Sequence, residues 1–384
     1  MTISRKIITK GIIDWATLAV EHNETIDYTG PMALAAAPSD YLDTADLKSV
    51  TAGGLIREDV LDQIFDISDI PTPFLDMITT DSFENSYSEW TEDKLAAPDL
   101  TNAAVSGSDA NTANNKANVT NAKRVGNQAQ ISTKLVAVTS RGQATTSIGR
   151  SDEMGYQTAR RLQELRRDVE AIALSAQGSV ADDNNATAGK TGGAGAWIVT
   201  NSSVGATGAV AGFNTGSKLV VAPTNGTKRG LTFSMIQTQI ENVYTLGGNP
   251  SVIMSVPGVT KRLAQYLFTT AYAAKPTQNV QGSGEGVAQT SQGFIDAFKT
   301  DFGFFMQIMP NRLQQTYGTA QADVFGFDPM YWALALLYGW KVEVLGKKGL
   351  SDQKMLHVDW MLKAKLERAN FIIRDIDPTV AVVA

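Results

Sequence analysis

The chain has 384 residues, and 43% of them are hydrophobic, which is enough for a sizeable core in one large or two ordinary domains. Its formal net charge of -6 argues against a protein whose main task is to grip phosphates through clustered Lys and Arg. The absence of Cys excludes disulfides, thiol nucleophiles and cysteine-ligated zinc, and only two histidines, His22 and His357, are available for catalysis or metal binding.

No segment of the sequence has the length expected for a signal peptide or a membrane span. Lys10 and Asp14 interrupt the apolar run at the N-terminus. The longest apolar patch elsewhere, Tyr331 to Trp340, is about half of what a membrane-spanning helix needs. We therefore expect a soluble protein, made in a cytoplasm, with no membrane partner.

The first part of the chain lacks a persistent hydrophobic period. Residues 1–56 predict an extended N-terminal arm with one short helix near Ile12–Val20. A short helix is expected around Val60–Phe65. Pro71 and Pro73 then predict an extended segment, because proline disfavours the helix interior and restricts the preceding residue.

Residues 83–139 predict a long two-stranded hairpin. Phe83, Tyr87 and Trp90 mark the first strand, and the alternation over Arg124–Thr139 marks its partner. The connecting residues 97–122 consist mostly of Ala, Asn, Thr, Ser and Gly. Because a two-stranded hairpin is marginally stable alone in water, we expect a neighbouring copy of the chain to hold it.

The strongest periodic signal predicts a helix over residues 151–177. Its apolar residues recur at steps of three and four, and Ser151 and Gly178 fit the N-cap and the closing turn. The apolar stripe consists of Leu162, Leu165, Val169, Ile172 and Ala176. The opposite, charged face consists of Arg160, Arg161, Glu164, Arg166, Arg167, Asp168 and Glu170. Because the signs are mixed, we interpret this face as solvated or subunit-facing rather than as a nucleic-acid patch.

The second half of the chain predicts loops, a compact helix-strand-helix unit and late strands. Residues 181–227 predict surface loops with short strands at Trp197–Val199 and Lys218–Val221. The unit that follows consists of helix Leu231–Leu246, capped by Thr232, buried strand Ser251–Val256 and helix Val259–Phe268. The late strands are Phe304–Met309, Asp323–Phe327, Tyr331–Leu337, Lys341–Leu345, Met355–Leu362 and Lys365–Ile373. We expect these strands to supply the sheet that covers the long helix.

No motif supports catalysis, and we predict no catalytic, cofactor-binding or metal-binding residue. Gly189-Lys190-Thr191 imitates a phosphate-binding loop, but Asn184 stands where that motif needs Gly. Acidic pairs such as Asp375 with Asp377 lack the Gly and Glu of a calcium loop. A serine nucleophile would need a suitably placed histidine, which neither His22 nor His357 provides.

The order of these elements resembles a tailed-phage major capsid protein of the Hong Kong 97 (HK97) fold, in the subgroup typified by SU10. The stretches that carry the resemblance are Arg57–Val60, Thr72–Phe74, Glu89–Asp93, Gly126–Ile131, Arg167–Glu170 and Lys341–Leu345. The resemblance implies an α+β fold over about Arg57 to Asp377. Its parts would be an N-terminal arm (1–56), the start of a peripheral domain (57–82), an extended hairpin loop (83–139), the peripheral domain with the long helix (140–199), an axial domain (200–328) and strands returning to the peripheral domain (329–384).

The resemblance also implies a mechanical function. Copies of the chain would form hexamers and pentamers and close into an icosahedral virion shell around non-specifically held double-stranded DNA. A portal and a separate scaffolding protein would be partners, and no cofactor is implied. The residues that we expect at contacts between subunits are Trp90, Asp93, Arg124, Gln128, Arg160 and Arg167.

Two other structural functions fit the same features. An encapsulin-like shell would share the fold and store a protein cargo instead of DNA. A phage tail or adhesion component would fit the many Ala, Asn, Thr and Gly residues in the loops. An enzyme fits least, because the sequence offers no acid-base or metal constellation.

Overall fold

The computed structural model describes residues 71–100, 103, 105–107, 122–145, 147–183, 186–273 and 297–383. All of them belong to one compact unit, residues 64–384, whereas the unit formed by residues 1–63 lies outside the described residues. The predictions for the N-terminal arm and for a helix at Val60–Phe65 therefore also lie outside the described residues.

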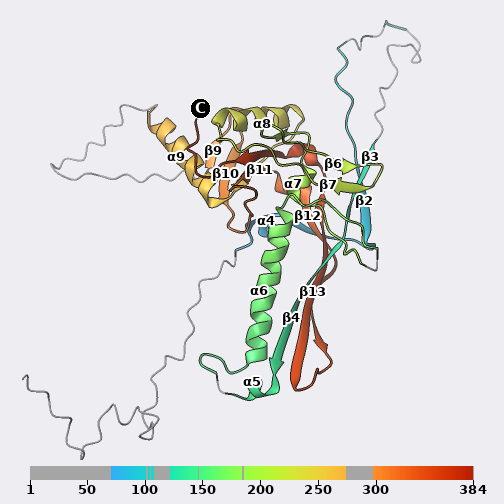
Figure 1. The fold of residues 1–384 in the computed structure, drawn as a ribbon. Helices are drawn as coiled ribbons and strands as arrows, with labels where there is room; N and C mark the ends of the chain where they lie inside the picture. Colours follow the sequence, from blue (N-terminus) through green and yellow to red (C-terminus); the bar gives the residue numbers. More distant parts are fainter. Residues whose placement is uncertain are drawn as a thin grey trace, which may run out of the picture. The chain divides into compact units, whose positions relative to one another are not determined.

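A four-stranded sheet in the order β1-β12-β13-β4 carries the long helix α6 (Figure 1). Its strands are β1 (Thr79–Ser82), β12 (Trp332–Leu345), β13 (Ser351–Ala364) and β4 (Gln130–Thr139). Strand β1 runs parallel to β12, and the other neighbours are antiparallel. The predicted strands Tyr331–Leu337 and Lys341–Leu345 form one strand, whose pairing with β13 is irregular around Tyr338.

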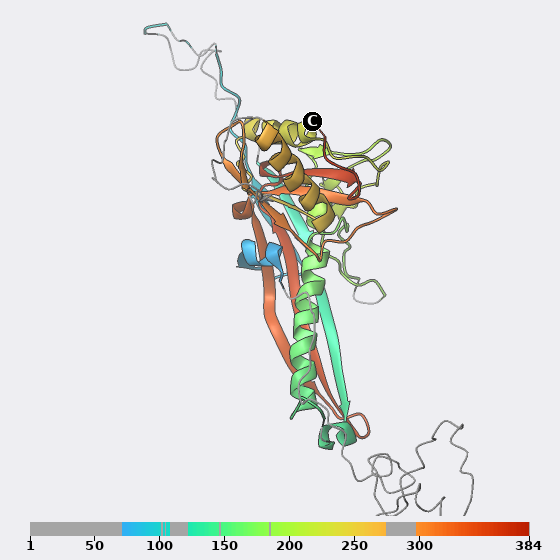
Figure 2. The same ribbon diagram turned by 90° about the vertical axis from the view of Figure 1, so that its left-hand side faces the viewer.

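Helix α6 (Glu153–Ala173) packs against β4 and β13, as Figure 2 shows from a second side. Leu165 and Val169 from the predicted stripe are buried, which confirms that late strands cover this helix, whereas Leu162 is 37% exposed. The predicted ends are wrong. The N-cap is Asp152, and the helix stops before Leu174. Gly178 instead packs so closely against Val220 and Ala222 that a Cβ would clash with their backbone atoms.

Glu170 is buried, although its sequence position predicted the charged outer face. Its carboxylate accepts hydrogen bonds from the backbone N–H groups of Phe74 (2.9 Å) and Leu75 (2.8 Å) and from Nδ2 of Asn311 (2.6 Å). The first two donors belong to the first turn of α4 (Pro73–Met77), which has no side-chain cap of its own. Glu170 thus satisfies the free N–H groups of a helix almost a hundred residues away in sequence.

Helix α4 contradicts the extended segment that we predicted after Pro71. Pro73 occupies the first helical turn, where a missing N–H costs nothing and the fixed φ favours a helix. Arg166 on α6 donates to Oγ1 of Thr72 (2.9 Å) and pairs with Asp76, so α6 holds both ends of this short helix.

A second sheet has six strands in the order β5-β14-β11-β8-β10-β9. They are β5 (Ser202–Ser203), β14 (Phe371–Ile376), β11 (Ala322–Phe327), β8 (Val252–Ser255), β10 (Phe305–Pro310) and β9 (Ala297–Lys299). Helices α8 (Phe233–Thr245) and α9 (Pro257–Ala273) pack on it, and Thr232 caps α8 as predicted by accepting from the Met235 N–H. The last strand, predicted at Lys365–Ile373, begins later than predicted. The 3₁₀ helix η3 (Glu367–Ala369) occupies the first part of that range and precedes β14.

Both faces of the three central strands of the second sheet, β8, β11 and β14, are buried. Ile253, Val324 and Ile373 pack with α8 and α9, whereas their neighbours Met254, Phe325 and Ile372 join the core around α6 and the first sheet. Alternate side chains of a strand point to opposite faces, so the same three strands serve two hydrophobic clusters. The continuous hydrophobic runs of these strands reflect this double burial.

Two small hairpins complete the described part of the chain. Strand β2 (Tyr87–Glu92) pairs with β3 (Lys123–Gln128), and β6 (Gly212–Asn214) with β7 (Leu219–Val221). The remaining short elements are α5 (Ser140–Ala144), α7 (Ala194–Trp197) and 3₁₀ helix η2 (Pro329–Tyr331). Strand β7 confirms the prediction at Lys218–Val221, but Trp197 ends a helical turn rather than starting a strand.

The predicted partner strand Arg124–Thr139 is divided at Ala129. Its first part, β3, pairs with β2, whereas β4 pairs with β13 in the first sheet. The Ala129 N–H donates to the Ser86 carbonyl (2.7 Å), which closes the ladder at this end. The two-stranded part of the predicted hairpin is therefore shorter than expected, and its second strand continues into the body of the subunit.

The role of Glu170 gives a stability prediction. Glu170→Ala leaves two N–H groups of α4 and the Asn311 amide without their acceptor, so we expect the free energy of unfolding to fall by about 2–4 kcal/mol. Glu164→Ala, which removes a partly exposed carboxylate of the same helix, should cost less than about 1 kcal/mol. Urea denaturation of unassembled subunits measures both, and equal losses would show that Glu170 does not hold α4.

Candidate assembly surfaces

The β2–β3 hairpin is fixed to the body of the subunit by Asn127. This side chain is fully buried, and its Nδ2 lies within hydrogen-bond distance of Thr191 Oγ1 (3.0 Å) and the carbonyls of Leu362 (2.8 Å) and Gly192 (3.2 Å). Its Oδ1 accepts from the N–H groups of Gly192 and Gln128, both at 2.9 Å. One amide thus joins β3, β13 and the loop after α6, and every polar atom of Asn127 has a partner.

Trp90 fixes the other strand of the hairpin. Its Nε1 donates to the Ala364 carbonyl (2.9 Å), and its ring lies 5.5 Å from that of Trp197. Across the ladder, Gly126 lies so close to Tyr87 and to the Ser88 carbonyl that a Cβ there would clash with both. The base of the hairpin is therefore closely packed.

The loop that leaves this base is exposed where the structure describes it. Leu95, Leu100 and Val105 are 92%, 98% and 80% exposed. The described part of this loop therefore leaves its large apolar side chains uncovered by the rest of the subunit.

The face of β4 that points away from α6 exposes two large apolar side chains. In β4, Val136 is buried and Lys134 pairs with Asp168 of α6 (2.6 Å), so the even-numbered residues face the helix. Ile131 and Leu135 lie on the opposite face and are 57% and 55% exposed. Val344 of β12, which is 77% exposed, lies on the other side of the sheet, because it pairs with Lys354 opposite Val136.

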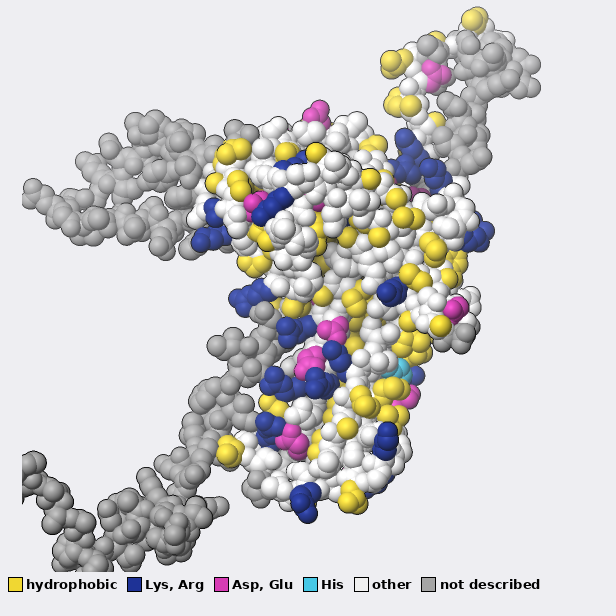
Figure 3. Space-filling view, in the orientation of Figure 1, with side chains coloured by type: hydrophobic (Ala, Val, Ile, Leu, Met, Phe, Trp, Pro, Cys, Tyr) yellow, Lys and Arg dark blue, Asp and Glu magenta, His cyan; other side chains and the backbone are white. Residues whose placement is uncertain are grey.

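Charged side chains of α6 contact one another along the helix. Arg161 pairs with Glu164, and Arg160 donates to the Tyr156 hydroxyl (3.0 Å). Side chains of both signs lie over α6 in Figure 3. The mixture of signs agrees with a solvated or subunit-facing surface.

The two acidic residues that the sequence pairs near the end of the chain have structural partners. Asp375, with a left-handed φ of 63°, accepts from the N–H groups of Gly205 (2.8 Å) and Gly226 (2.9 Å). Asp377 pairs with Lys228 (3.0 Å), and hydrogen bonds from Thr379 are the main cause that lowers the pKa of Asp377 to about 2.

Within the residues described, no group of three or more His, Asp or Glu is arranged to hold a metal ion. No helix in the described ranges is both long and apolar enough to cross a membrane.

Comparison with protein families identifies this architecture. The profile of the SU10 major capsid protein family matches residues 41–377, which is most of the chain. The chain belongs to the SU10 major capsid protein family. The predicted function, a structural subunit of a phage capsid in the virion, is confirmed. The match begins earlier than the resemblance at Arg57 and includes part of the predicted N-terminal arm.

Individual relatives agree with the family. The chain is 26% identical to the major capsid protein of Escherichia phage Phieco32 over 336 residues, which cover 79% of this chain and 89% of the relative. The capsid structure of cyanophage A-1(L) matches with a TM-score of 0.56 at 13% identity, over 86% of this chain and 99% of the other. A native GTA particle capsid matches with a TM-score of 0.52 at 11% identity, over 87% and 99%. These structures confirm the predicted α+β HK97 capsid fold.

The six predicted contact residues of this capsid protein form two groups. Trp90, Arg124 and Gln128 lie in the hairpin ladder with Asp93 just beyond it, whereas Arg160 and Arg167 lie on α6. The indole of Trp90 is bound to its own subunit, and Gln128 is buried. Arg124 pairs with Glu89 but remains 74% exposed, and Asp93 accepts from the Lys94 N–H. Their contacts with a neighbouring subunit stay a prediction.

The sequence did not predict the structural roles of three residues. Asn127, Thr191 and Glu170 connect segments that are far apart in sequence. Gly189-Lys190-Thr191 only imitates a nucleotide-binding motif. In the structure, Oγ1 of Thr191 accepts hydrogen bonds from Nδ2 of Asn127 (3.0 Å) and from the Leu362 N–H (3.2 Å). For Asn127, the available signal was a polar residue that alternates with Val125 and Ala129.

The anchor predicts a large effect for one amide. Asn127→Ala removes the partner of several buried backbone and hydroxyl groups, so we expect unfolding free energy to fall by about 2–4 kcal/mol. Asn214→Ala, in an exposed turn where Asn214 accepts from Gly216 (2.8 Å), should cost about 1 kcal/mol or less. Chemical denaturation of unassembled subunits tests this pair, and a small loss for Asn127→Ala would contradict the anchoring role.

Proposed function

We propose that copies of this chain assemble as hexamers and pentamers into an icosahedral shell that encloses double-stranded DNA. The observation that carries the proposal is the contrast within the hairpin. Its base is anchored by Asn127 and Trp90, whereas the apolar side chains of the adjoining loop are almost fully exposed. A rigid base with an uncovered extension is suited to reach across a second subunit.

Each part of the fold has a place in this proposal. The first sheet with α6 forms the peripheral domain, and residues 83–139 include the loop that lies across the adjacent subunit. The second sheet with α8 and α9 forms the axial domain, which gathers subunits around the five- and six-fold axes. The exposed apolar face of β4 supports contacts outside the single subunit.

The partners follow from the same proposal. DNA is held without sequence specificity, which agrees with a chain of net charge -6 and no concentrated basic run. A portal and a separate scaffolding protein complete assembly, and the subunit has no catalytic task. The match to a phage capsid family favours this reading over an encapsulin-like compartment or a tail component.

Deleting the loop tests the proposal. Removal of Pro98–Asn121 leaves the paired residues Tyr87–Glu92 and Lys123–Gln128 in place, so the subunit should fold with an unchanged circular dichroism spectrum. It should fail to form closed particles, because the segment that reaches the neighbour is missing. Replacement of the same residues by a Gly/Ser segment of equal length is the control for loop closure and should fail as well. Closed particles from the deletion variant would contradict the role of the hairpin between subunits.

The exposed apolar side chains on the outer face of β4 give a second test. Leu135→Lys changes an exposed side chain, so the unfolding free energy should change by less than about 0.5 kcal/mol. A buried charge at an interface is costly, and we expect at least a tenfold lower yield of particles by sedimentation. Thr133→Lys, at an exposed polar site on the same face, shows whether any added charge has this effect. Full assembly of Leu135→Lys would remove this face from the proposed contacts.

A further inference from the structure

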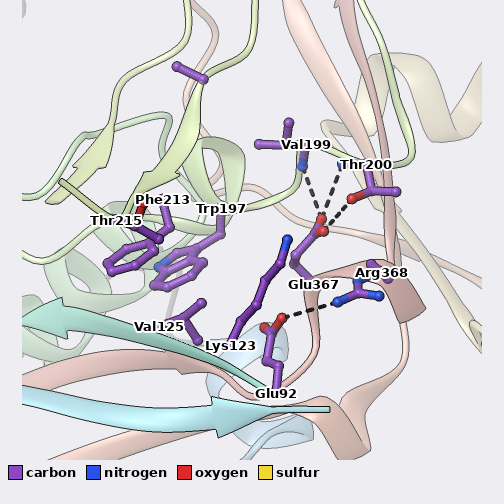
Figure 4. Close-up of a pocket in the computed structure, with 11 residues that line it drawn as sticks. Glu92, Lys123, Val125, Trp197, Val199, Thr200, Phe213, Thr215, Glu367 and Arg368 are labelled. Atoms are coloured by element: carbon purple, nitrogen blue, oxygen red, sulfur yellow. Dashed lines mark hydrogen bonds and ion pairs between the residues drawn. The ribbon is translucent and has the colours of Figure 1, made fainter. Parts of the chain in front are cut away.

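A small hollow lies where the loop leaves the hairpin base (Figure 4). Its volume is about 220 Å³, below the ~300–1,000 Å³ of pockets for drug-sized ligands, so it suits a single side chain rather than a cofactor. One wall is apolar and includes Trp197 and Phe213, whose rings are parallel within 3° and 5.9 Å apart. The other wall is formed by Glu92, Lys123, Glu367 and Arg368.

Glu92 is the unusual group in this hollow. It is only 7% exposed, and its Oε1 is buried without a hydrogen-bond partner among the described residues. Its Oε2 forms an ion pair with Nη2 of Arg368 at 3.7 Å, a separation that is too long for a hydrogen bond. Burial, followed by the nearby charge of Glu367, raises the pKa of Glu92. Oε1 of this buried carboxylate therefore lacks the hydrogen-bond donor that a buried charge needs.

The other charged side chains of the hollow do not donate to Oε1 of Glu92. Glu367 has its own partners, because it accepts from the N–H groups of Val199 and Thr200, both at 3.2 Å, and from the Thr200 hydroxyl. Lys123, the cross-strand neighbour of Glu92, is exposed and extends toward Glu367 in Figure 4. A cationic N–H donor would satisfy Glu92 best, because hydrogen bonds between charged partners are about twice as strong as neutral ones.

We propose that this pocket binds one organic cation, an alkylammonium or guanidinium group, whose N–H groups donate to Glu92 while its carbon stem lies against Trp197 and Phe213. Aromatic walls suit such a stem and its charge. In the assembled shell the cation is a Lys or Arg side chain of a second copy of this chain, because the pocket adjoins the loop that reaches the neighbour. This last step rests on the proposed function.

Titration of the full-length, unassembled subunit with N-acetyl-arginine amide and N-acetyl-lysine amide, followed by ligand-observed NMR, tests the pocket. We expect saturable binding at millimolar concentration and none by N-acetyl-glutamine amide. Glu92→Gln should weaken binding at least tenfold, whereas Glu343→Gln, which changes an exposed glutamate of β12, should leave it unchanged. Absence of saturable binding to the folded wild-type subunit would overturn the proposal.

The pH dependence gives a readout that does not require a variant. Protonation of Glu92 removes the charge that attracts the cation, so affinity should fall as the pH is lowered through the raised pKa of Glu92. Glu367, Arg368 and Lys123 are the other charged groups that face the site. The weak residual binding of Glu92→Gln should not follow this profile, and an identical profile in both proteins would assign the effect to another group.

Assembled shells distinguish the source of the cation. If a second copy fills the pocket, wild-type shells should bind the arginine probe at least tenfold more weakly than free subunits. Equal binding to shells and subunits would overturn the assignment to a second copy and leave a free small cation as the ligand. Failure to form shells at all would instead contradict the proposed function, whatever the free subunit binds.

Discussion

The pairing of β13 with strands on both sides is the constraint on which the rest of the structure depends. Over its fourteen residues it joins β12 on one side and β4 on the other, and α6 packs on the ladder that results. The end of the same strand receives the hairpin, because the carbonyls of Leu362 and Ala364 accept from Asn127 and Trp90. One strand therefore sets the position of both the long helix and the projecting loop.

This arrangement separates folding from assembly. The anchors of the hairpin are buried polar groups with nearly complete hydrogen bonding, so they define one geometry for its base. The apolar residues that would extend the core beyond the base, Leu95 and Leu100, remain exposed in the single subunit. A subunit can thus reach a stable fold and still have surfaces that are completed only by other copies, which is what membership of a capsid family requires.

Sequence patterns predicted the elements better than the contacts between them. The stripe with Leu165 and Val169 located α6, because a period of 3.6 residues is a local property. The same period placed Glu170 on the charged face, and only the distant first turn of α4 explains its burial. The alternation over Arg124–Thr139 likewise could not show that its two halves pair with different strands. The hollow at Glu92 is lined by residues of β2, β3 and η3. No local sequence pattern indicates that these three elements lie next to one another.

The central claim is that sister subunits complete the projecting segments and close into a shell. Electron microscopy of the purified full-length chain, expressed with and without its neighbouring gene products, tests this most directly. The account predicts hollow polyhedral particles with six- and five-fold capsomers. Single subunits at every concentration and in both preparations, or tubes and spikes in place of closed particles, would contradict it.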